Sequence, residues 1–210
     1  SRGGSTPAIV QDNDDIGMIH WSGYDGDNYE QGAHIYGEVD GTPADGDMPM
    51  RLVFATRKAG AASGAGRLII DNNGYITTPA RPYFSANGNP SITSNIVNDF
   101  ANVHNNNGSH YNNTTGKFTA PVAGFYWFSA GIWQNSASSG TNILIQLTYK
   151  PPTGSSHAIA GANAPAIQYA SMNCSGGVYM VTGGTVYISA TQVSVRASTP
   201  RNYFCGYLVG

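Results

Sequence analysis

The chain has 210 residues, of which 27 are Gly and 11 are Pro, while 40% are hydrophobic and only 10% are charged. This composition fits an all-β protein with many turns, because no window carries a sustained helical apolar period. No stretch is long and apolar enough to span a bilayer, so we expect no membrane insertion. The few basic residues form no stripe, so we also expect no nucleic-acid partner.

The chain opens with Ser1-Arg2-Gly3-Gly4 rather than with Met or a signal sequence. We expect residues 1–10 to be a flexible linker and the chain to be the end of something longer. Four short strand candidates follow: Gly17–Trp21, Ala33–Val39, Arg51–Thr56 and Arg67–Ile70. Turn-forming residues separate them, at Asp25–Asn28, Asp40–Pro43 and Asp71–Gly74. This β-rich module is small and poorly cored, so it would gain stability by pairing with copies of itself around an axis.

Charge divides the chain near residues 78–82. Residues 1–80 hold eleven of the twelve carboxylates and five of the ten Lys and Arg residues, a net charge of −6. The remainder holds Asp99 against five cations, a net charge of +4. We therefore predict one domain over residues 11–80 and a second over residues 81–210.

The single carboxylate of the second domain argues against catalysis there. Glycoside hydrolysis in its usual form needs two carboxyl groups flanking the bond, and Asp99 is alone. Calcium prefers several oxygen ligands with charge among them. We therefore expect a protein that is not an enzyme, with no catalytic residues, no cofactor and no metal site.

The tract Gly116–Phe128 is the most informative part of the sequence. It reads as two strands joined by a tight corner, because Pro121 cannot donate to a ladder and Gly124 opens a run of strand-forming residues. Side chains then alternate between two faces. One face carries Tyr126, Phe128 and Ile132, and the other carries Phe125, Trp127 and Trp133. One of these faces must belong to a core.

Further motifs surround the tract in a fixed order: Asn105–Tyr111 and Thr114–Gly116 before it, Ser175–Val181 after it, and Phe204–Leu208 near the end. From about Arg81 to Gly210, this order resembles the globular head of complement component 1q, whose jelly roll is shared with the tumour necrosis factor superfamily. The resemblance implies a ten-stranded jelly-roll β-sandwich that assembles as a homotrimer, with both ends of the domain at one base. The periodicity alone predicts only a β-sandwich.

The first domain resembles a module common near the tips of bacteriophage tail fibres. The motifs are Asp40–Pro43, Asp47–Thr56 and Leu68–Ile76, and the resemblance covers roughly residues 11–76. In that family, the module forms a stalk or collar between the fibre shaft and the receptor-binding tip. The chain departs from many such fibres, because no self-cleaving chaperone segment follows Gly210. Either that segment was removed or the knob folds without it.

Together, the two resemblances imply a viral receptor-binding protein that attaches to a bacterial host. Its expected partners are two further copies of the chain, an upstream fibre shaft, and a bacterial surface polysaccharide or outer-membrane protein. Its expected place is the distal end of the tail fibre in the virion, after assembly in the host cytoplasm. Three weak sites on one trimer can act as one tight site on a dense surface.

Two other functions stay open. The first is that of a secreted or cell-surface, trimeric, lectin-like complement component 1q-domain protein of a cellular organism, and the second is that of a polysaccharide depolymerase. The absence of a Gly-x-y period in the chain counts against a complement-type stem. A polysaccharide depolymerase would need its carboxylate pair in the first domain or across subunits.

Receptor contacts are expected in the loops at the distal end of the second domain. If the strands alternate up and down and the last strand runs to the base, that end holds residues 121–123, 150–172 and 191–201. Their polar and aromatic members suit hydroxyls and anionic groups of a polysaccharide. These residues are Lys150, His157, Asn163, Gln168, Tyr169, Arg196 and Arg201. Solvated loop residues without a function would look the same.

Trp127 and Trp133 are separate candidates. If Tyr126 and Phe128 face the core, the two Trp rings can stack on sugars from the outer face of the sheet. They equally fit a cover over neighbouring side chains or a subunit contact.

The His and Cys residues give weaker signals. No His-x-His spacing supports a metal site, although a trimer could bring His20, His34, His104 or His110 together on its axis. The resemblance places Cys174 and Cys205 on strands of one sheet that are not neighbours, which makes an internal disulfide improbable. Free thiols fit assembly in a reducing cytoplasm.

Overall fold

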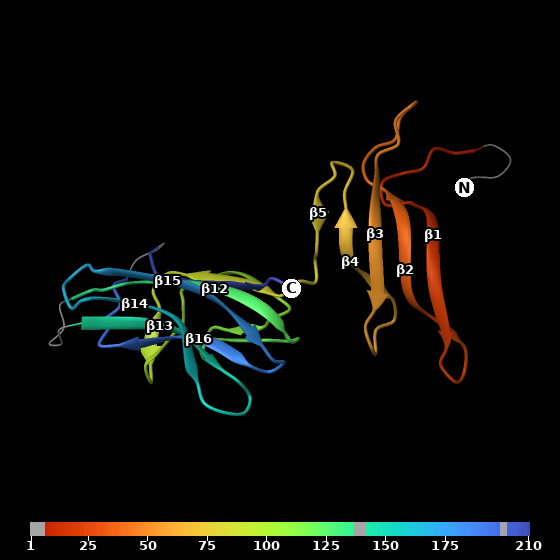
Figure 1. The fold of residues 1–210 in the computed structure, drawn as a ribbon. Coiled ribbons are helices and arrows are strands. Elements are labelled where there is room, and N and C mark those ends of the chain that lie inside the picture. Colours follow the sequence, from red (N-terminus) through yellow and green to blue (C-terminus); the bar gives the residue numbers. More distant parts are fainter. Residues whose placement is uncertain (1–6, 137–141, 198–200) are drawn as a thin grey trace. The chain divides into compact units, whose positions relative to one another are not determined.

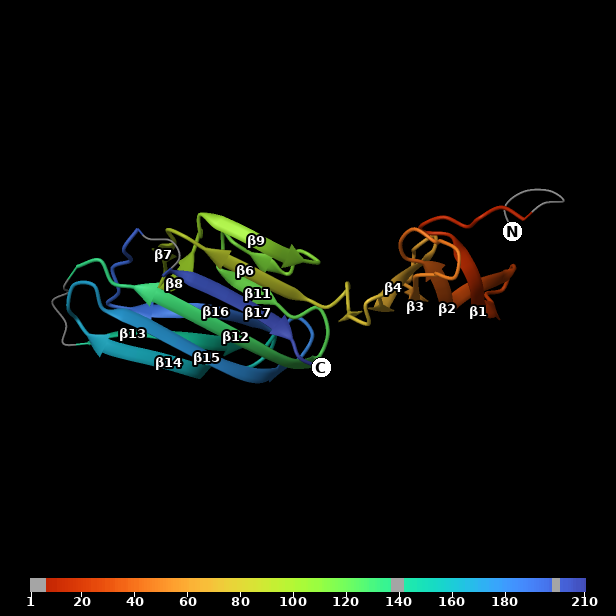
Figure 2. The ribbon, with the colours of Figure 1, turned by 90° about the horizontal axis from the view of Figure 1, so that it is seen from above.

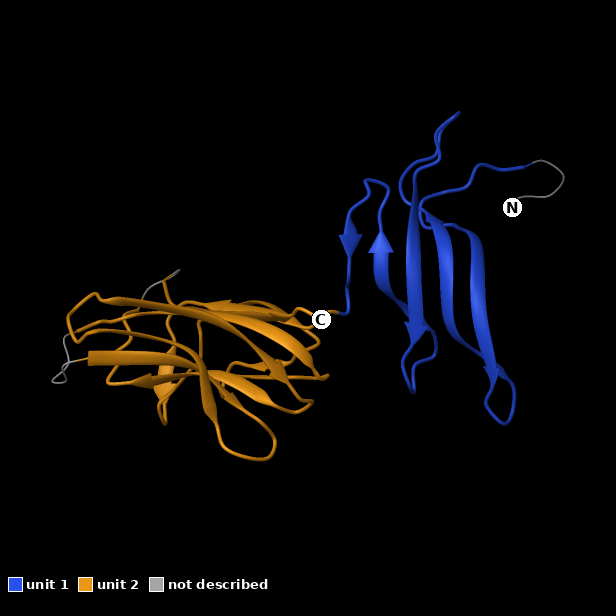
Figure 3. Ribbon diagram, in the orientation of Figure 1, with its two compact units in different colours: residues 1–80 blue, residues 81–210 orange. Residues whose placement is uncertain are grey.

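The computed structural model describes residues 7–136, 142–197 and 201–210. Most of the predicted linker therefore lies outside the described residues. All regular structure in this part of the chain is β, which confirms the predicted class. It holds no helix able to cross a membrane. The contacts divide the chain into two compact units, residues 1–80 and 81–210 (Figure 3).

The first unit is one antiparallel sheet, which we call the N-terminal sheet, in the order β1-β2-β3-β4-β5 (Figure 1). Its strands are β1 (Asp15–Tyr24), β2 (Tyr29–Val39), β3 (Met50–Arg57), β4 (Gly64–Ile70) and β5 (Ile76–Thr77). Gly26 and Gly74 lie in the β1–β2 and β4–β5 turns with φ of 112° and 83°. Glycine adopts this backbone conformation without a steric penalty, so the Asp-Gly and Asn-Gly pairs end the strands as predicted.

Both faces of the N-terminal sheet carry large apolar side chains. On one face, Ile19 pairs with Ile35, Ile35 with Phe54, and Phe54 with Leu68. All ten residues of β1 are exposed. The buried hydrophobic residues among those described in this unit are Val39, Val53 and Ala55. The sheet therefore lacks a core of ordinary size and leaves apolar surface for a partner to cover.

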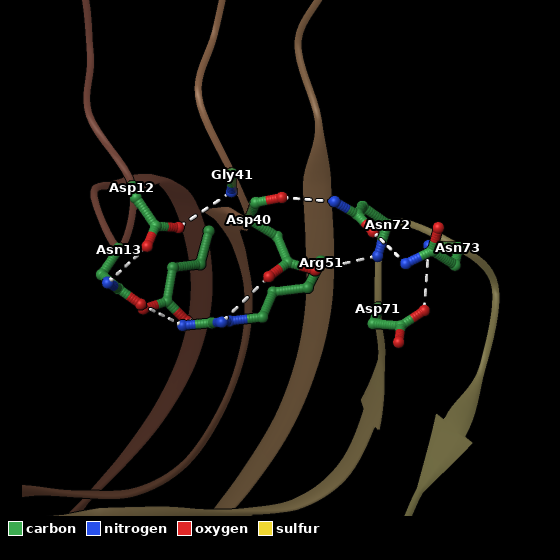
Figure 4. Close-up of polar contacts among 9 residues, drawn as sticks. Asp12, Asn13, Asp40, Gly41, Arg51, Asp71, Asn72 and Asn73 are labelled. Atoms are coloured by element: carbon green, nitrogen blue, oxygen red, sulfur yellow. Dashed lines mark hydrogen bonds and ion pairs between the residues drawn. The ribbon is translucent and has the colours of Figure 1, made fainter.

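A polar network around Arg51 holds one end of the N-terminal sheet (Figure 4). Arg51 donates to a carboxylate oxygen of Glu38 (2.8 Å), to Asp40 (3.2 Å) and to the amide oxygen of Asn13 (2.6 Å). The other carboxylate oxygen of Asp40 accepts the backbone N–H of Asn72 (2.9 Å). The hydrogen bond to Glu38 is the main cause that raises the pKa of Arg51 above its ordinary value. The network ties the segment before β1, the end of β2 and the β4–β5 turn together.

The second unit is a β-sandwich, drawn as two stacked layers in Figures 1 and 2. The β12 sheet has the order β15-β12-β17-β6-β9, and the β13 sheet has the order β10-β11-β16-β13-β14. The first comprises β15 (Ser171–Met180), β12 (Gly124–Trp133), β17 (Tyr203–Leu208), β6 (Tyr83–Asn87) and β9 (Asn102–Asn107). The second comprises β10 (Tyr111–Asn112), β11 (Lys117–Thr119), β16 (Thr185–Thr191), β13 (Asn142–Lys150) and β14 (His157–Pro165).

Two short strands, β7 (Ser91–Thr93) and β8 (Ile96–Asn98), form a hairpin that joins the β13 sheet where Ile96 pairs with Ser189. Ser94 and Asn95 close this hairpin with φ of 52° and 63°. The described residues of the unit thus form more strands than the ten that the resemblance implied.

Alternation along β12 decides which side chains form the core. Tyr126, Phe128 and Ile132 are fully buried, while Phe125 and Trp127 are 41% and 39% exposed. This confirms the predicted division of the two faces. Aromatic and aliphatic side chains from the inner faces of both sheets fill the space between them. A covered inner face therefore fixes which way every β12 side chain points.

The C-terminus identifies the two ends of the sandwich. The N–H of Leu208 donates to the carbonyl of Pro82 (3.0 Å), so the unit starts and ends on the same side, as the resemblance implied. We call this side the base and the opposite side the apex. The N–H of Phe125 donates to the carbonyl of Gly210 (2.8 Å), so β12 starts at the base. The corner at residues 121–123 therefore lies at the base, and its predicted place at the apex is wrong.

The error comes from one strand that the sequence did not reveal. The predicted loop at residues 150–172 contains β14, which pairs with β13 along its length. The prediction counts strands back from the C-terminal strand. Leaving out β14 therefore reverses the expected direction of every strand that precedes it in the chain. The sequence of β14, His-Ala-Ile-Ala-Gly-Ala-Asn-Ala-Pro, is poor in strand-forming residues, so pairing with β13 rather than propensity makes it a strand. The connection from residue 151 to 156 consequently lies at the base, and only residues 166–170 of that segment turn at the apex.

Candidate functional site

The structure divides the seven predicted receptor-binding residues between the two ends of the sandwich. Lys150 pairs with Thr185, which follows the turn after Met180 at the base, and its ammonium group donates to the carbonyl of Gly154. His157 pairs with the neighbouring Tyr149, so it lies at the base as well. The predicted apical place of Lys150 and His157 is therefore wrong, for the reason given by β14.

The other five residues lie on the apical side. Asn163 is exposed on β14, where it pairs with Leu144 near the apical end of β13. Gln168 and Tyr169 are exposed in the β14–β15 connection. Arg196 and Arg201 belong to the β16–β17 connection, of which residues 198–200 lie outside the described part.

Four side chains from three segments meet at the apex, and we call them the apex cluster: Trp133, Tyr169, Arg196 and Arg201. The guanidinium carbon of Arg196 lies 4.5 Å from the ring centre of Trp133 and 4.2 Å from that of Tyr169. The guanidinium carbon of Arg201 lies 4.3 Å from the ring centre of Trp133. The indole N–H of Trp133 donates to the carbonyl of Tyr169 (3.0 Å). Two cations thus rest on two connected rings at favourable distances.

Two buried amide side chains hold the backbone of the apex cluster in place. The Asn202 side chain accepts the N–H of Trp133 (2.8 Å) and donates to the carbonyl of Arg196 (2.7 Å). The Gln134 side chain accepts the backbone N–H of Ser194 in the β16–β17 connection (2.9 Å), while the backbone carbonyl of Gln134 accepts the N–H of Tyr169 (3.2 Å). Both amides are fully buried. The three segments are therefore fixed before any ligand arrives.

Tyr169 has a φ of 67°, which is uncommon for a large side chain. Hydrogen bonds on both sides of the residue maintain this conformation, one from its N–H to Gln134 and one from Trp133 to its carbonyl. Residues held in sparsely populated backbone regions cluster at binding sites. The strain therefore favours a functional role for the apex cluster.

Neither guanidinium of the apex cluster has an acidic partner among the described residues. Among the described residues, the guanidiniums that form ion pairs are those of Arg51 and Arg57, both in the first unit. Asp99, the carboxylate of the second unit, follows β8, and its backbone N–H binds the carbonyl of Asn113 (2.9 Å). The apex thus carries positive charge that the unit itself leaves unneutralised.

Sequence reasoning found three members of the apex cluster as loop residues and Trp133 as an outer-face ring, but it did not bring them together. Gln134 and Asn202 were not predicted at all. Trp133, Tyr169 and Arg196 are far apart in sequence, so no local pattern links them. Counting β14 as a strand would have placed the C-terminal end of β12 at the apex, beside the β14–β15 and β16–β17 connections.

Trp127 belongs to a different surface, the outer face of the β12 sheet. Phe125 pairs with Tyr179, and Trp127 pairs with Tyr207. These four side chains are between 39% and 63% exposed, and we call them the aromatic face. A contiguous apolar surface of this kind marks an interaction site, which fits a subunit contact or sugar stacking.

The Cys and His residues do not form a shared site. Cys174 is buried on the inner face and Cys205 lies on the outer face, on strands that flank β12 from opposite sides, so the two thiols are free. Burial raises the pKa of both thiols. His20 and His34 face each other across β1 and β2. The described residues hold no group of three His, Cys, Asp or Glu side chains placed for a metal ion.

Replacing Asn202 by Ala is expected to lower the free energy of unfolding by about 1–3 kcal/mol, because it leaves the N–H of Trp133 and the carbonyl of Arg196 without their partner. Asn163→Ala, which changes an exposed Asn on an edge strand, is the matched control and should stay within about 0.5 kcal/mol of wild type. Urea unfolding of both variants measures the difference. Equal stabilities of the two variants would show that the hydrogen bonds of the Asn202 side chain contribute nothing to the free energy of unfolding.

Comparison with known proteins places this sandwich in a family. The C1q domain model matches residues 83–209, a majority of the chain. The globular domain of zebrafish complement 1qA is 19% identical, with a TM-score of 0.45 over 62% of this chain and 98% of that chain. Murine APRIL is 12% identical, with a TM-score of 0.49 over 61% of this chain and 98% of that chain. No curated protein matches the chain. The match of the family model to the sandwich shows that this chain belongs to the C1q domain family.

Proposed function

We propose that this chain is the trimeric receptor-binding tip of a bacteriophage tail fibre, which attaches to a bacterial surface receptor through the apex of its C1q domain. The apex cluster carries the proposal. It offers rings and unneutralised guanidiniums on a backbone held by buried amides, which suits recognition of a polar ligand. C1q domains are typically binding modules, and we propose no enzymatic role.

Two uncovered surfaces support a trimer. C1q domains typically assemble as trimers, and the aromatic face is a surface that such assembly would bury. The N-terminal sheet, with its exposed β1 and apolar residues on both faces, would gain its missing core from the same strands of two further copies. Three apex clusters on one trimer would then engage a dense receptor surface together.

The remaining parts of the proposal concern place and neighbours. The N-terminal sheet would connect the C1q domain to an upstream fibre shaft, at the distal end of the tail fibre in the virion. Assembly in the reducing host cytoplasm agrees with the two free cysteines. The receptor would be a surface polysaccharide, with an outer-membrane protein as the other candidate.

Binding of the fluorescently labelled full chain to a panel of bacterial strains tests the proposal. We expect strain-restricted binding that competes with virion adsorption and disappears when surface polysaccharide is removed. Binding that survives this removal but is lost after protease treatment would identify a protein receptor. If a confirmed trimer binds no strain, the proposal fails.

The family match equally fits a secreted or cell-surface, trimeric, lectin-like C1q protein of a cellular organism. Binding to animal cells but to no bacterium would favour that function. Release of soluble fragments from purified capsule or lipopolysaccharide would instead identify a depolymerase.

A further inference from the structure

We infer that the apex cluster binds the carboxylate of an acidic sugar, with the two guanidiniums as hydrogen-bond donors and the rings as a platform for the sugar body. For its biological setting, this inference rests on the proposed function, because the acidic sugar would belong to the receptor glycan. It specifies which residues of the apex bind and what chemical group they select.

The first argument is the unused hydrogen-bonding capacity of the two arginines. A guanidinium has five N–H donors in its plane, and stacking on a ring engages its face rather than these donors. Among the described residues, no carboxylate, carbonyl or hydroxyl accepts from the side chain of Arg196 or Arg201, whereas Arg51 in the first unit has three acceptors. No residue in the described part of the chain therefore occupies the donors of the two arginines.

The second argument is the concentration of like charge. Both guanidiniums lie over the ring of Trp133, and one of them also lies over Tyr169. Two cations near one ring repel each other, and the negative face of the indole offsets this repulsion only in part. An anion bound beside the two guanidiniums would reduce this repulsion. The site thus favours an anionic ligand over a neutral one.

The third argument selects the class of anion. A carboxylate is planar and matches the fork of a guanidinium in a bidentate contact. Tyr169 is 50% exposed, so its ring offers an apolar surface beside the charged groups. Sugar rings present C–H groups that pack on such a surface, whereas inorganic phosphate has no apolar part to use it. An acidic saccharide therefore fits the whole cluster.

The fourth argument is that the site is already organised. Asn202 and Gln134 fix the backbone at Trp133, Tyr169 and Arg196 through main-chain hydrogen bonds. Ligand binding therefore orders few additional groups, which keeps the entropic penalty low. Because these hydrogen bonds end on main-chain atoms and not on the arginine side chains, exchange of an arginine side chain should leave this scaffold intact.

Titration calorimetry of the 210-residue protein tests the inference with three acidic probes: oligogalacturonate, an oligosaccharide ending in N-acetylneuraminic acid, and a glucuronate-containing oligosaccharide. Their carboxyl methyl esters serve as neutral ligands of the same shape. At least one free acid should bind on the order of tenfold or more tightly than its ester, and more weakly as salt is added. If none of the acids binds more tightly than its ester, or if inorganic phosphate binds more tightly than every acid, the inference is overturned.

Matched variants locate the binding. Arg196→Gln and Arg201→Gln should each lower the affinity for the acidic probe by roughly tenfold or more, because each removes a charged donor. Lys117→Gln is the control, since Lys117 is also a cation over a ring, 5.5 Å from the centre of Tyr187, but belongs to β11. Its affinity should match wild type. An equal loss in all three variants would point to general charge attraction and would contradict the site.

The bacterial binding assay separates this inference from the proposed function. If wild type binds its host strain and the two Arg variants bind it equally well, the apex cluster is not the site, and of the proposed function only attachment to the bacterial host stands. If the acidic probes bind at the apex but no bacterial strain does, the inference stands and the proposed function fails.

Discussion

Replacing Phe118 by Ala is expected to lower the free energy of unfolding of the C1q domain by about 3–5 kcal/mol. Phe118 is fully buried on β11, and its ring centre lies 5.3 Å from that of Phe84 and 5.5 Å from those of Tyr126 and Phe128. Phe118 thus carries a ring of the β13 sheet into the aromatic core of the β12 sheet, beside Tyr111 of β10, whose ring centre lies 4.4 Å from that of Phe84. Removing it leaves a cavity between two sheets whose backbones are held by their own ladders and cannot close around it.

Thr119→Ala is the control for this substitution, because Thr119 is the next residue of β11 and its side chain is exposed. Its unfolding free energy should change by less than about 0.5 kcal/mol. Urea unfolding, at one protein concentration for all variants, measures both changes. A small effect of Phe118→Ala would show that the two sheets are not joined through this ring.

The second large effect is expected for Gly116→Ala. Gly116 has a φ of 67°, and a Cβ added to it would lie 2.2 Å from the carbonyl oxygen of Val97. A residue other than Gly pays about 1–2 kcal/mol for the left-handed conformation. The overlap with a backbone atom adds about 1–3 kcal/mol, because β8 must move. We therefore expect a total loss of stability of about 2–5 kcal/mol.

Gly183→Ala separates the two contributions. Gly183 also has a positive φ, 82°, but a Cβ there would meet only the ring of Pro152 at an ordinary distance of 3.6 Å. Its substitution should therefore lower stability by about 1–2 kcal/mol, which is the conformational part alone. Thermal and urea unfolding of the two variants provide the comparison. Equal losses would mean that β8 yields to the added methyl group at no measurable energy.

The sequence predicted the parts of the fold that one residue type or one short period determines. The alternation of β12 was predicted correctly because one face of the strand is covered and the other is not. The turns at Gly26 and Gly74 were found because a positive φ favours glycine. The C1q-like sandwich was found from motifs in a fixed order along the chain.

What the sequence did not reveal depends on pairing across long distances. The Ala and Gly residues of β14 have little strand propensity, so its conformation comes from the neighbouring β13. This one omission moved Lys150 and His157 from the base to the apex in the prediction. The meeting of Trp133 with Tyr169 and the two arginines was likewise not predicted, because the end of β12 and two separate connections must converge before the side chains meet.

The buried amides at the apex have a consequence for how this protein can change. The Asn202 amide binds the main chain of Trp133 and Arg196, and the Gln134 amide binds the backbone N–H of Ser194. None of these bonds uses a side chain of the apex cluster. The atoms that hold the local fold therefore differ from the side-chain atoms that we propose bind the ligand. New side chains at positions 169, 196 and 201 can be tried on the same frame with little loss of stability. Under the proposed function, a change of receptor specificity needs only a few substitutions at these positions.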